Sequence, residues 1–349
     1  MTAPETDESR ILESAYWMQP YVPRRFLRNG HLQTIVGNFL PRSYALPEPD
    51  DHLVEVEPAS DGRAASFVLC HCHWQPAEVR AERLTVVIVH GLEGSSSSRY
   101  VLGNSARALA AGFNVVRMNM RSCGDGEKYS PSIYHSGRSE DVALVMEELV
   151  REYGLSRFAL IGYSMGGNLV LKLAGELGDQ PPTYLKAVIG VSPLMDLAAS
   201  SAALHEPQNR IYEWKFLLAM LKRFRRKITL FPGVYTTEGL DRIRTMNDFD
   251  REIVARYGGF AGAEDYYQKV ASSNWADRIV VPTLILHALD DPFIRMIPET
   301  RAKLLANPHV TLIETEHGGH CAFLSPERGE AGYWAETTVL GFLLSTVEG

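Results

Sequence analysis

The sequence predicts an α/β fold with a mostly parallel, doubly wound sheet of eight strands. Apolar runs of strand length recur along its 349 residues, and some, such as residues 85–89, are almost wholly apolar. Such runs are typical of parallel strands that helices cover on both faces. Helical patterns separate most of the runs, and this alternation of strand and helix indicates the α/β class. A chain of this length can bury one large core or two modest ones.

Each expected element has its own signal in the chain. The strands are expected over residues 53–57, 66–72, 84–89, 113–118, 158–161, 187–191, 283–287 and 310–314. The helices between them are expected over residues 105–111, 139–153 and 168–177. In a doubly wound sheet, ligands bind at the carboxyl ends of the strands. Candidate site residues are therefore sought on the loops that follow the strands.

The chain divides into three parts of different character. Residues 1–50 are rich in proline, aromatic and polar residues and are expected to form an arm packed on the core. The α/β core is expected to comprise residues 51–194 and 281–349. The segment 195–280 is longer than a usual crossover connection, and it predicts a helical cap inserted between the sixth and seventh strands. Its helical stretches are 211–224, 239–257 and 263–271.

Composition restricts the possible functions. Hydrophobic residues make up 45% of the chain and charged residues 22%, as in an ordinary globular protein. The net charge of −7 argues against nucleic-acid binding, which favours a basic surface. No apolar stretch is long enough for a transmembrane segment, and the acidic N-terminus lacks the apolar core of a secretory signal. Four cysteines without a disulfide framework fit a reducing compartment, so a cytoplasmic protein is expected.

Residues Cys70, His71, Cys72 and His73 suggest a metal site at first sight. They lie in an expected strand, where successive side chains point to opposite faces of the sheet. Four ligands on one strand therefore cannot converge on a tetrahedral metal ion. We expect ordinary strand residues and no metal or other cofactor.

The segment from residue 160 to residue 167 carries the most chemical information. An apolar strand signal leads into Gly162, then Ser164, then Gly166, and a helical pattern follows. This is the context of a nucleophile elbow, in which glycines relieve a sharp turn and leave the serine hydroxyl exposed. The alternative is a simple turn between a strand and a helix, without a catalytic role. The presence of catalytic partner residues elsewhere in the chain distinguishes the two interpretations.

A serine nucleophile requires a base and a group that orients the base. Asp290 and Asp291 follow the seventh expected strand, and His317 and His320 follow the eighth. The chain order of serine, aspartate and histidine is that of the nucleophile-elbow hydrolases. We favour His320, because the two glycines before it free the loop to aim an imidazole. The two aspartates are not separable on physical grounds alone.

An oxyanion hole requires two backbone donors. One is the amide of Met165, the residue after the nucleophile. The loop after the third expected strand reads His-Gly-Leu-Glu-Gly over residues 90–94. Because Gly91 lets this backbone turn toward the site, the amide of Leu92 is expected to be the second donor.

With these motifs in place, the chain resembles the α/β-hydrolases of the YheT-like branch, which groups bacterial hydrolases with yeast medium-chain ethyl ester synthase/esterases and eukaryotic abhydrolase-domain lipases. The resemblance implies the α/β-hydrolase fold, the nucleophile at Ser164, the base at His320 and the acid at Asp291. The family often has acidic or small residues at 70–73, where this chain differs. The residues that carry the resemblance are 28–34, 90–94, 119–121, 162–167, 265–267, 290–293 and 318–320.

The expected activity is cleavage of small-molecule carboxylic esters through an acyl-enzyme, and the resemblance implies short- to medium-chain acyl esters or acylglycerols. Acyl transfer to an alcohol and thioester hydrolysis would use the same residues. A non-catalytic binding protein on a hydrolase scaffold is the alternative from another class. His31 is a less favoured catalytic candidate, because no partner is visible near it. The oligomeric state is not predicted.

A basic segment within the expected cap runs from Lys222 to Lys227. A solvated helix end is the first interpretation. Weak contact with an anionic membrane surface is the alternative. The basic residues follow the neighbouring apolar residues rather than sharing their turns, which argues against an amphipathic anchor.

Overall fold

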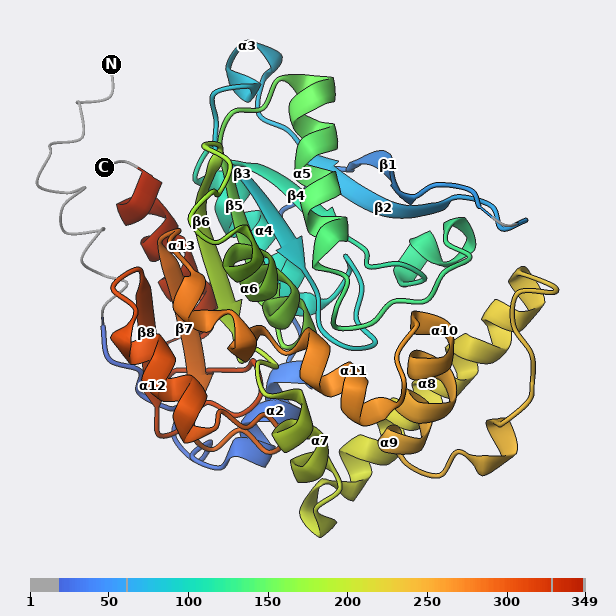
Figure 1. Ribbon diagram of the computed structural model, residues 1–349. Helices are drawn as coiled ribbons and strands as arrows, with labels where there is room; N and C mark the ends of the chain where they lie inside the picture. Colours follow the sequence, from blue (N-terminus) through green and yellow to red (C-terminus); the bar gives the residue numbers. More distant parts are fainter. Residues whose placement is uncertain (1–18, 61, 328, 348–349) are drawn as a thin grey trace, which may run out of the picture.

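A computed structural model describes residues 19–60, 62–327 and 329–347 of the chain. A sheet of eight strands runs through its centre, with helices on both faces (Figure 1). The strand order is β1-β2-β4-β3-β5-β6-β7-β8. The strands are β1 (Asp50–Glu57), β2 (Ser66–His73), β3 (Thr85–Val89), β4 (Asn114–Met118), β5 (Phe158–Tyr163), β6 (Leu185–Val191), β7 (Thr283–Ala288) and β8 (Val310–Thr315).

The pairing of the strands confirms a mostly parallel sheet. β2 is antiparallel to both β1 and β4. All the pairs from β4 through β3, β5, β6 and β7 to β8 are parallel. The carboxyl ends of the parallel strands therefore meet at one edge of the sheet, where the candidate loops emerge.

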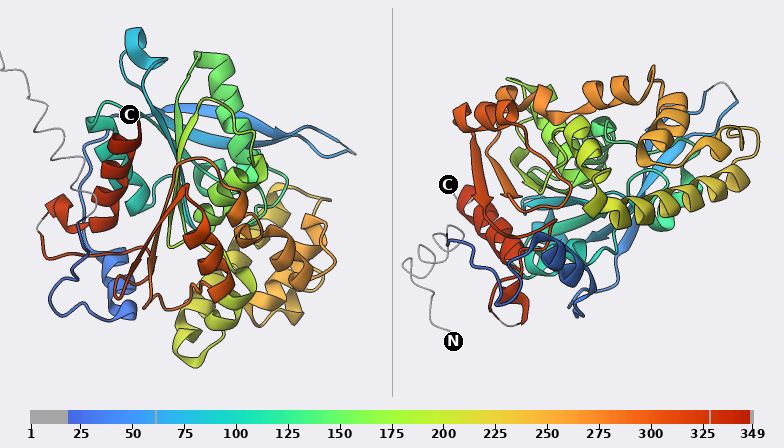
Figure 2. Two further views of the ribbon diagram at one scale, coloured as in Figure 1. Left: turned by 60° about the vertical axis from the view of Figure 1, so that its left-hand side comes forward. Right: turned by 90° about the horizontal axis from the view of Figure 1, so that it is seen from below.

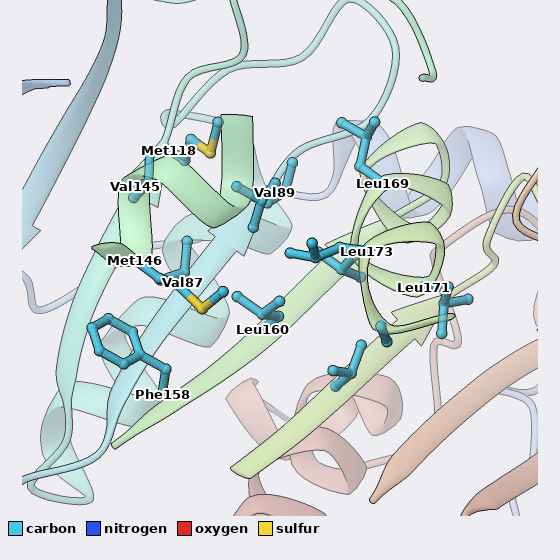
Figure 3. Close-up of a cluster of buried hydrophobic side chains, with 14 of the residues drawn as sticks. Val87, Val89, Met118, Val145, Met146, Phe158, Leu160, Leu169, Leu171 and Leu173 are labelled. Carbon is cyan, nitrogen blue, oxygen red and sulfur yellow. The ribbon is translucent and has the colours of Figure 1, made fainter. Parts of the chain in front are cut away.

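Alternate side chains of the central strands pack against opposite layers of helices. Val87 of β3 and Leu160 of β5 face α5 (Ser139–Tyr153) and α6 (Met165–Leu177), as Figure 3 shows. Ile88, next to Val87, belongs to the cluster on the other face. This double burial explains why these strands are apolar along their whole length.

The remaining core helices complete the two layers. α4 (Arg99–Ala110) and α13 (Trp334–Val347) contribute buried residues to the same cluster as Ile88. α12 (Pro298–Ala306) contributes Leu304 to the cluster of α5 and α6. A short helix, α3 (Ala77–Arg80), precedes β3.

The helical cap occupies the chain between β6 and β7, as predicted, and gathers at one end of the sheet (Figures 1 and 2). It has a hydrophobic cluster of its own, which includes Phe224, Phe249 and Ile253. The limits 195–280 remain our proposal for its extent. Its main elements are α7 (Leu197–Leu204), α8 (Arg210–Leu230), α9 (Met246–Phe249), a π-helix (Asp250–Ala255), α10 (Arg256–Gly258) and α11 (Ala263–Val270).

The N-terminal arm lies against the C-terminal part of the core (Figure 2). Its helix α2 (Gly30–Phe39) begins after Asn29, whose side chain accepts a hydrogen bond from the Leu32 amide. The Tyr21 hydroxyl donates to the carbonyl of Leu324 at 2.9 Å. Residues 1–18 of the predicted arm lie outside the described residues.

The cysteine and histidine residues of β2 alternate as the strand geometry requires. Cys70 and Cys72 are buried in the cluster that includes Val87. His71 contacts the Asp51 carboxylate at 2.6 Å, and His73 accepts from the Arg117 guanidinium at 3.1 Å. Among the described residues, no group of three or more histidine, cysteine or acidic side chains is arranged to hold a metal ion.

A buried ion pair ties the loop after β4 to α5 and β1. The Arg121 guanidinium, 1% exposed, donates to both carboxylate oxygens of Asp141 at 2.7 and 2.6 Å. It also donates to the carbonyl of Val56 and pairs with Glu57. Burial raises the pKa of Asp141 to about 6, although Arg121 opposes this rise.

We expect Arg121→Met to lower the free energy of unfolding by about 3–5 kcal/mol, because Asp141 would remain buried without its partner. Urea denaturation followed by circular dichroism measures this loss. Arg151→Met is the control, since it removes an exposed pair with Glu148 and should change stability little. Similar losses in the two variants would contradict the assignment of a structural role to Arg121.

Candidate active site

Ser164 lies at the turn between β5 and α6, where the elbow was predicted. Its backbone has a φ of 54° and a ψ of −115°, a strained conformation for a residue with a side chain. A Cβ at Gly162 would lie 2.2 Å from the Gly166 carbonyl oxygen, and one at Gly166 would lie 2.3 Å from the carbonyl oxygen of Val89. Both positions therefore require glycine. The Ser164 amide donates to the Val191 carbonyl at 2.9 Å.

Asp291 and His320 come together from the loops that follow β7 and β8. The Nδ1 atom of His320 lies 2.8 Å from Oδ2 of Asp291. Oδ1 of Asp291 accepts from the amides of Phe293 and Ile294 at 3.1 and 2.9 Å. The carboxylate is 3% exposed. One carboxylate oxygen thus accepts from the loop amides, and the other faces the imidazole.

The second aspartate has a different partner. Oδ1 of Asp290 accepts from the amide of Gly319 at 2.8 Å. Oδ2 of Asp290 lies 3.5 Å from Nδ1 of His317. Asp290 and His317 therefore shape the loop that carries His320, and the geometry separates the two aspartates that the sequence left open.

The Asp291–His320 pair shifts the pKa values of both groups. Burial acts to raise the pKa of Asp291, but the imidazole and the loop amides hold that pKa below its ordinary value. Burial acts to lower the pKa of His320, but the Cys321 sulfur and the Asp291 carboxylate raise it well above the ordinary value. At neutral pH the aspartate is therefore ionised, and it can accept a hydrogen bond from Nδ1 of the imidazole.

Cys321 and Val191 connect His320 to the backbone of Ser164. Nε2 of His320 is 3.6 Å from Sγ of Cys321, which is 3.9 Å from the Val191 carbonyl that accepts from the Ser164 amide. Within the described residues, the Ser164 hydroxyl and the imidazole share no hydrogen bond. Such bonds are often long in unliganded enzymes and shorten when substrate binds. The position of Cys321 at this edge was not predicted from the sequence.

The loop after β3 passes directly against Ser164. A Cβ at Gly91 would lie 3.1 Å from the Cβ of Ser164. His90 holds this loop, because its Nε2 accepts from the Met120 amide at 3.1 Å and its Nδ1 can then donate to the Gly91 carbonyl at 2.8 Å. Burial lowers the pKa of His90 to about 4, so the ring is neutral as this pattern requires.

The two predicted oxyanion donors lie beside the serine. Leu92 and Met165 line the same cavity as Ser164. Met165 is the first residue of α6, and an amide in the first turn of a helix has no acceptor within the helix. The arrangement leaves these donors suited to a developing negative charge, and their role stays a prediction.

The cap contacts this loop through a partly buried ion pair. Arg223 of α8 pairs with Glu93 at 3.0 Å, and the Tyr134 hydroxyl donates to Glu93 at 2.6 Å. Lys227 also turns inward and donates to the Ser130 carbonyl at 2.6 Å. Burial lowers the pKa of Lys227 to about 7.

Two residues of the basic segment therefore belong to the interface between cap and core. Lys222 and Arg225 remain exposed, whereas Arg226 pairs with Glu127. Contact with a membrane surface stays a prediction, and it now depends on fewer free charges. Within the part of the chain that the structure describes, no helix is long and apolar enough to cross a membrane.

A cavity of about 110 Å³ lies next to Ser164. Its lining is mainly apolar, with Leu194, Phe216, Met220 and Phe293 among the lining residues. Asp250 and Tyr267 also line it, and their side chains share a hydrogen bond of 2.6 Å. Burial raises the pKa of Asp250 to about 7. The cavity thus offers an apolar surface with a polar patch.

His31, the less favoured catalytic candidate, contacts the cap. Its ring stacks on Tyr212 with 5.7 Å between ring centroids, and its Nδ1 lies 3.2 Å from the Tyr212 hydroxyl. Tyr212 packs on Phe293, and Phe293 packs on the imidazole of His320. The ring of His31 is thus two aromatic side chains away from His320.

The fold and the elbow together define a protein of the α/β-hydrolase class. A family model described as alpha/beta hydrolase fold matches residues 85–326, which is more than half of the chain. The chain therefore belongs to this family, and the resemblance drawn from the motifs is confirmed.

Particular relatives have names that point to esters. The "Putative esterase YheT" of Escherichia coli K12 is 32% identical over 356 residues, covering 98% of this chain and 97% of that protein. The "Monoacylglycerol lipase" of Saccharomyces cerevisiae is 27% identical over 258 residues, covering 71% of this chain and 56% of that protein. Among solved structures, the Pyrococcus furiosus esterase Pf2001 has the same fold, with a TM-score of 0.55 and 17% identity over 87% of this chain and 97% of that one.

We expect Asp291→Asn to lower the pKa of His320, because the variant removes the carboxylate charge that stabilises the imidazolium. Asp290→Asn is the matched control and should leave this pKa nearly unchanged. Titration of the His320 ring protons by NMR measures both. If Asp290→Asn lowered the pKa more than Asp291→Asn, the pairing seen in the structure would be wrong.

Proposed function

We propose that the chain is a serine hydrolase that cleaves carboxylic esters through an acyl-enzyme on Ser164. The observation that carries the proposal is the combination of a buried Asp291–His320 pair with a strained serine beside an apolar cavity. The esterase and lipase names of the relatives support the same reaction class. A small-molecule acyl ester is the proposed substrate, and no cofactor is required by this chemistry.

Each group has a defined task in the proposed mechanism. His320 accepts the Ser164 proton on Nε2 while the serine oxygen attacks the ester carbonyl. Asp291 holds the other ring nitrogen in the donor state and stabilises the imidazolium. The amides of Leu92 and Met165 bind the oxyanion, and loss of one such donor typically costs about 3–4 kcal/mol of transition-state stabilisation.

The first tetrahedral intermediate then collapses to the acyl-enzyme, which water hydrolyses in a second half-reaction. His320 gives its proton to the leaving alcohol, and the acyl group remains on Ser164. Water enters, loses a proton to His320 and attacks the acyl carbonyl. Collapse of the second tetrahedral intermediate breaks the bond to Ser164, and His320 returns the proton to the serine.

The size and lining of the cavity beside Ser164 support the proposal of a short- to medium-chain acyl group. Its volume of about 110 Å³ corresponds to roughly four water molecules at about 30 Å³ each, and a methylene group is close to a water molecule in size. Its walls of leucine, phenylalanine and methionine suit an alkyl chain.

We expect Ser164→Ala to lower kcat for a p-nitrophenyl ester by roughly 10⁴-fold or more, because no acyl-enzyme can form. Ser105→Ala is the control, since Ser105 is also buried but lies on α4 and donates to the Val101 carbonyl. A fluorophosphonate probe should label the wild type and the control only. Equal labelling after Ser164→Ala would show that the nucleophile is another residue.

A p-nitrophenyl ester series from acetate to palmitate should give the highest kcat/KM at short to medium chain length. The volume of the cavity limits the length of the alkyl chain that can be buried next to Ser164. Steady-state kinetics of the wild type beside Ser164→Ala measures the profile. A background-level profile for every ester would count against the esterase assignment.

A further inference from the structure

The start of helix α2 is wedged between the two loops that carry Asp291 and His320. A Cβ at Gly30 would lie only 1.8 Å from the carbonyl oxygen of Asp290. A Cβ at Gly319 would lie 2.4 Å from the carbonyl oxygen of Gly30. Backbone therefore touches backbone on both sides, which leaves no room for a side chain at either glycine.

The hydroxyl of Thr34 connects this helix to the proposed base. Its Oγ1 accepts from the amide of His320 at 2.8 Å and donates to the carbonyl of Gly30 at 2.7 Å. The hydroxyl thus uses both its donor and an acceptor site, and the backbone of His320 is fixed relative to the first turn of α2. Thr34 is not among the residues that line the cavity beside Ser164.

Gln33 connects the same helix to the chain just beyond His320. The side chain is fully buried. Its Oε1 accepts from the Leu324 amide at 3.0 Å, and its Nε2 donates to the Leu27 carbonyl at 2.7 Å and to the Tyr21 hydroxyl at 2.8 Å. The Gln33 side chain therefore joins Tyr21 and Leu27 of the arm to the loop after β8.

The loop after β8 needs such external support, because its own backbone is strained. Cys321 and Phe323 have φ values of 61° and 42°, and Gly318 and Gly319 also have positive φ. Side-chain-bearing residues persist in this region only when surrounding contacts hold them there. Thr34 and Gln33 supply hydrogen bonds on either side of Cys321.

We propose that the segment Gly30 to Thr34 of the arm is a positioning element that holds His320 in reach of Ser164, with the Thr34 hydroxyl as its key contact. This inference rests on the proposed esterase function and assigns a role to a motif, residues 28–34, that the triad and oxyanion hole leave unused. Thr34 acts through the backbone of His320 and touches neither the substrate cavity nor the imidazole.

The test compares Thr34→Val with Thr34→Ser on a p-nitrophenyl ester. Thr34→Val keeps the shape and removes the hydroxyl, so we expect kcat to fall about 10–100-fold, as small misplacements of reacting groups do. KM should change less than about threefold, because the cavity is untouched. Thr34→Ser keeps the hydroxyl and should retain kcat within about threefold of the wild type.

A control variant separates positioning from general stability. Thr283→Val removes a buried threonine hydroxyl that donates to the Val281 carbonyl at 2.8 Å, at the start of β7. Thermal unfolding of all variants reports their stability, and we expect Thr283→Val to retain kcat even where its Tm falls. If Thr34→Val fails to fold, Thr34→Ala, which removes the same hydroxyl, takes its place.

The outcomes distinguish this inference from the function on which it rests. Wild-type turnover that survives Ser164→Ala would overturn the proposed function itself. Serine-dependent turnover with kcat unchanged in folded Thr34→Val or Thr34→Ala would overturn the positioning role alone. Equal losses in Thr34→Ser and Thr34→Val, or a loss confined to KM, would overturn it as well.

Discussion

The backbone at Ser164 is the steric constraint around which the rest of the site is arranged. Its positive φ is possible because Gly162 and Gly166 let β5, α6 and the end of β3 approach without side chains between them. The amide and carbonyl of Ser164 bond to Val191 and Leu194. The serine is thus held by the sheet on one side and, on the other, by the chain that leads from β6 toward the cap, with little freedom to relax.

Core, cap and arm each contribute polar contacts to the neighbourhood of this serine. The core supplies Asp291 and His320, the cap reaches Glu93 through Arg223, and the arm reaches His320 through Thr34. Buried hydrogen-bonded groups are costly to leave without partners, so each contact strongly favours one docked arrangement. The geometry proposed for ester cleavage therefore depends on all three parts packing together.

The fold class and the elbow were predictable because their signals are local. Apolar strand runs, and glycines two residues on either side of Ser164, can be recognised within a short window of sequence. The choice of Asp291 over Asp290 was not predictable by physics, because neighbouring carboxylates differ only in the direction that the loop gives them. The contacts Thr34–His320 and Arg223–Glu93 were also missed, since their partners are 286 and 130 residues apart.

The order in which the chain is synthesised determines when the arm can dock. Gln33 bonds to Leu324, a partner 291 residues further along the chain. Ribosomes add roughly 5–20 residues each second, so these partners emerge on the order of tens of seconds apart. In the later part of that interval a nascent chain contains the serine turn, but neither the histidine loop nor the contact that fixes it. The site geometry proposed for ester cleavage could therefore form only after the loop that ends near Leu324 has been made and has met the arm.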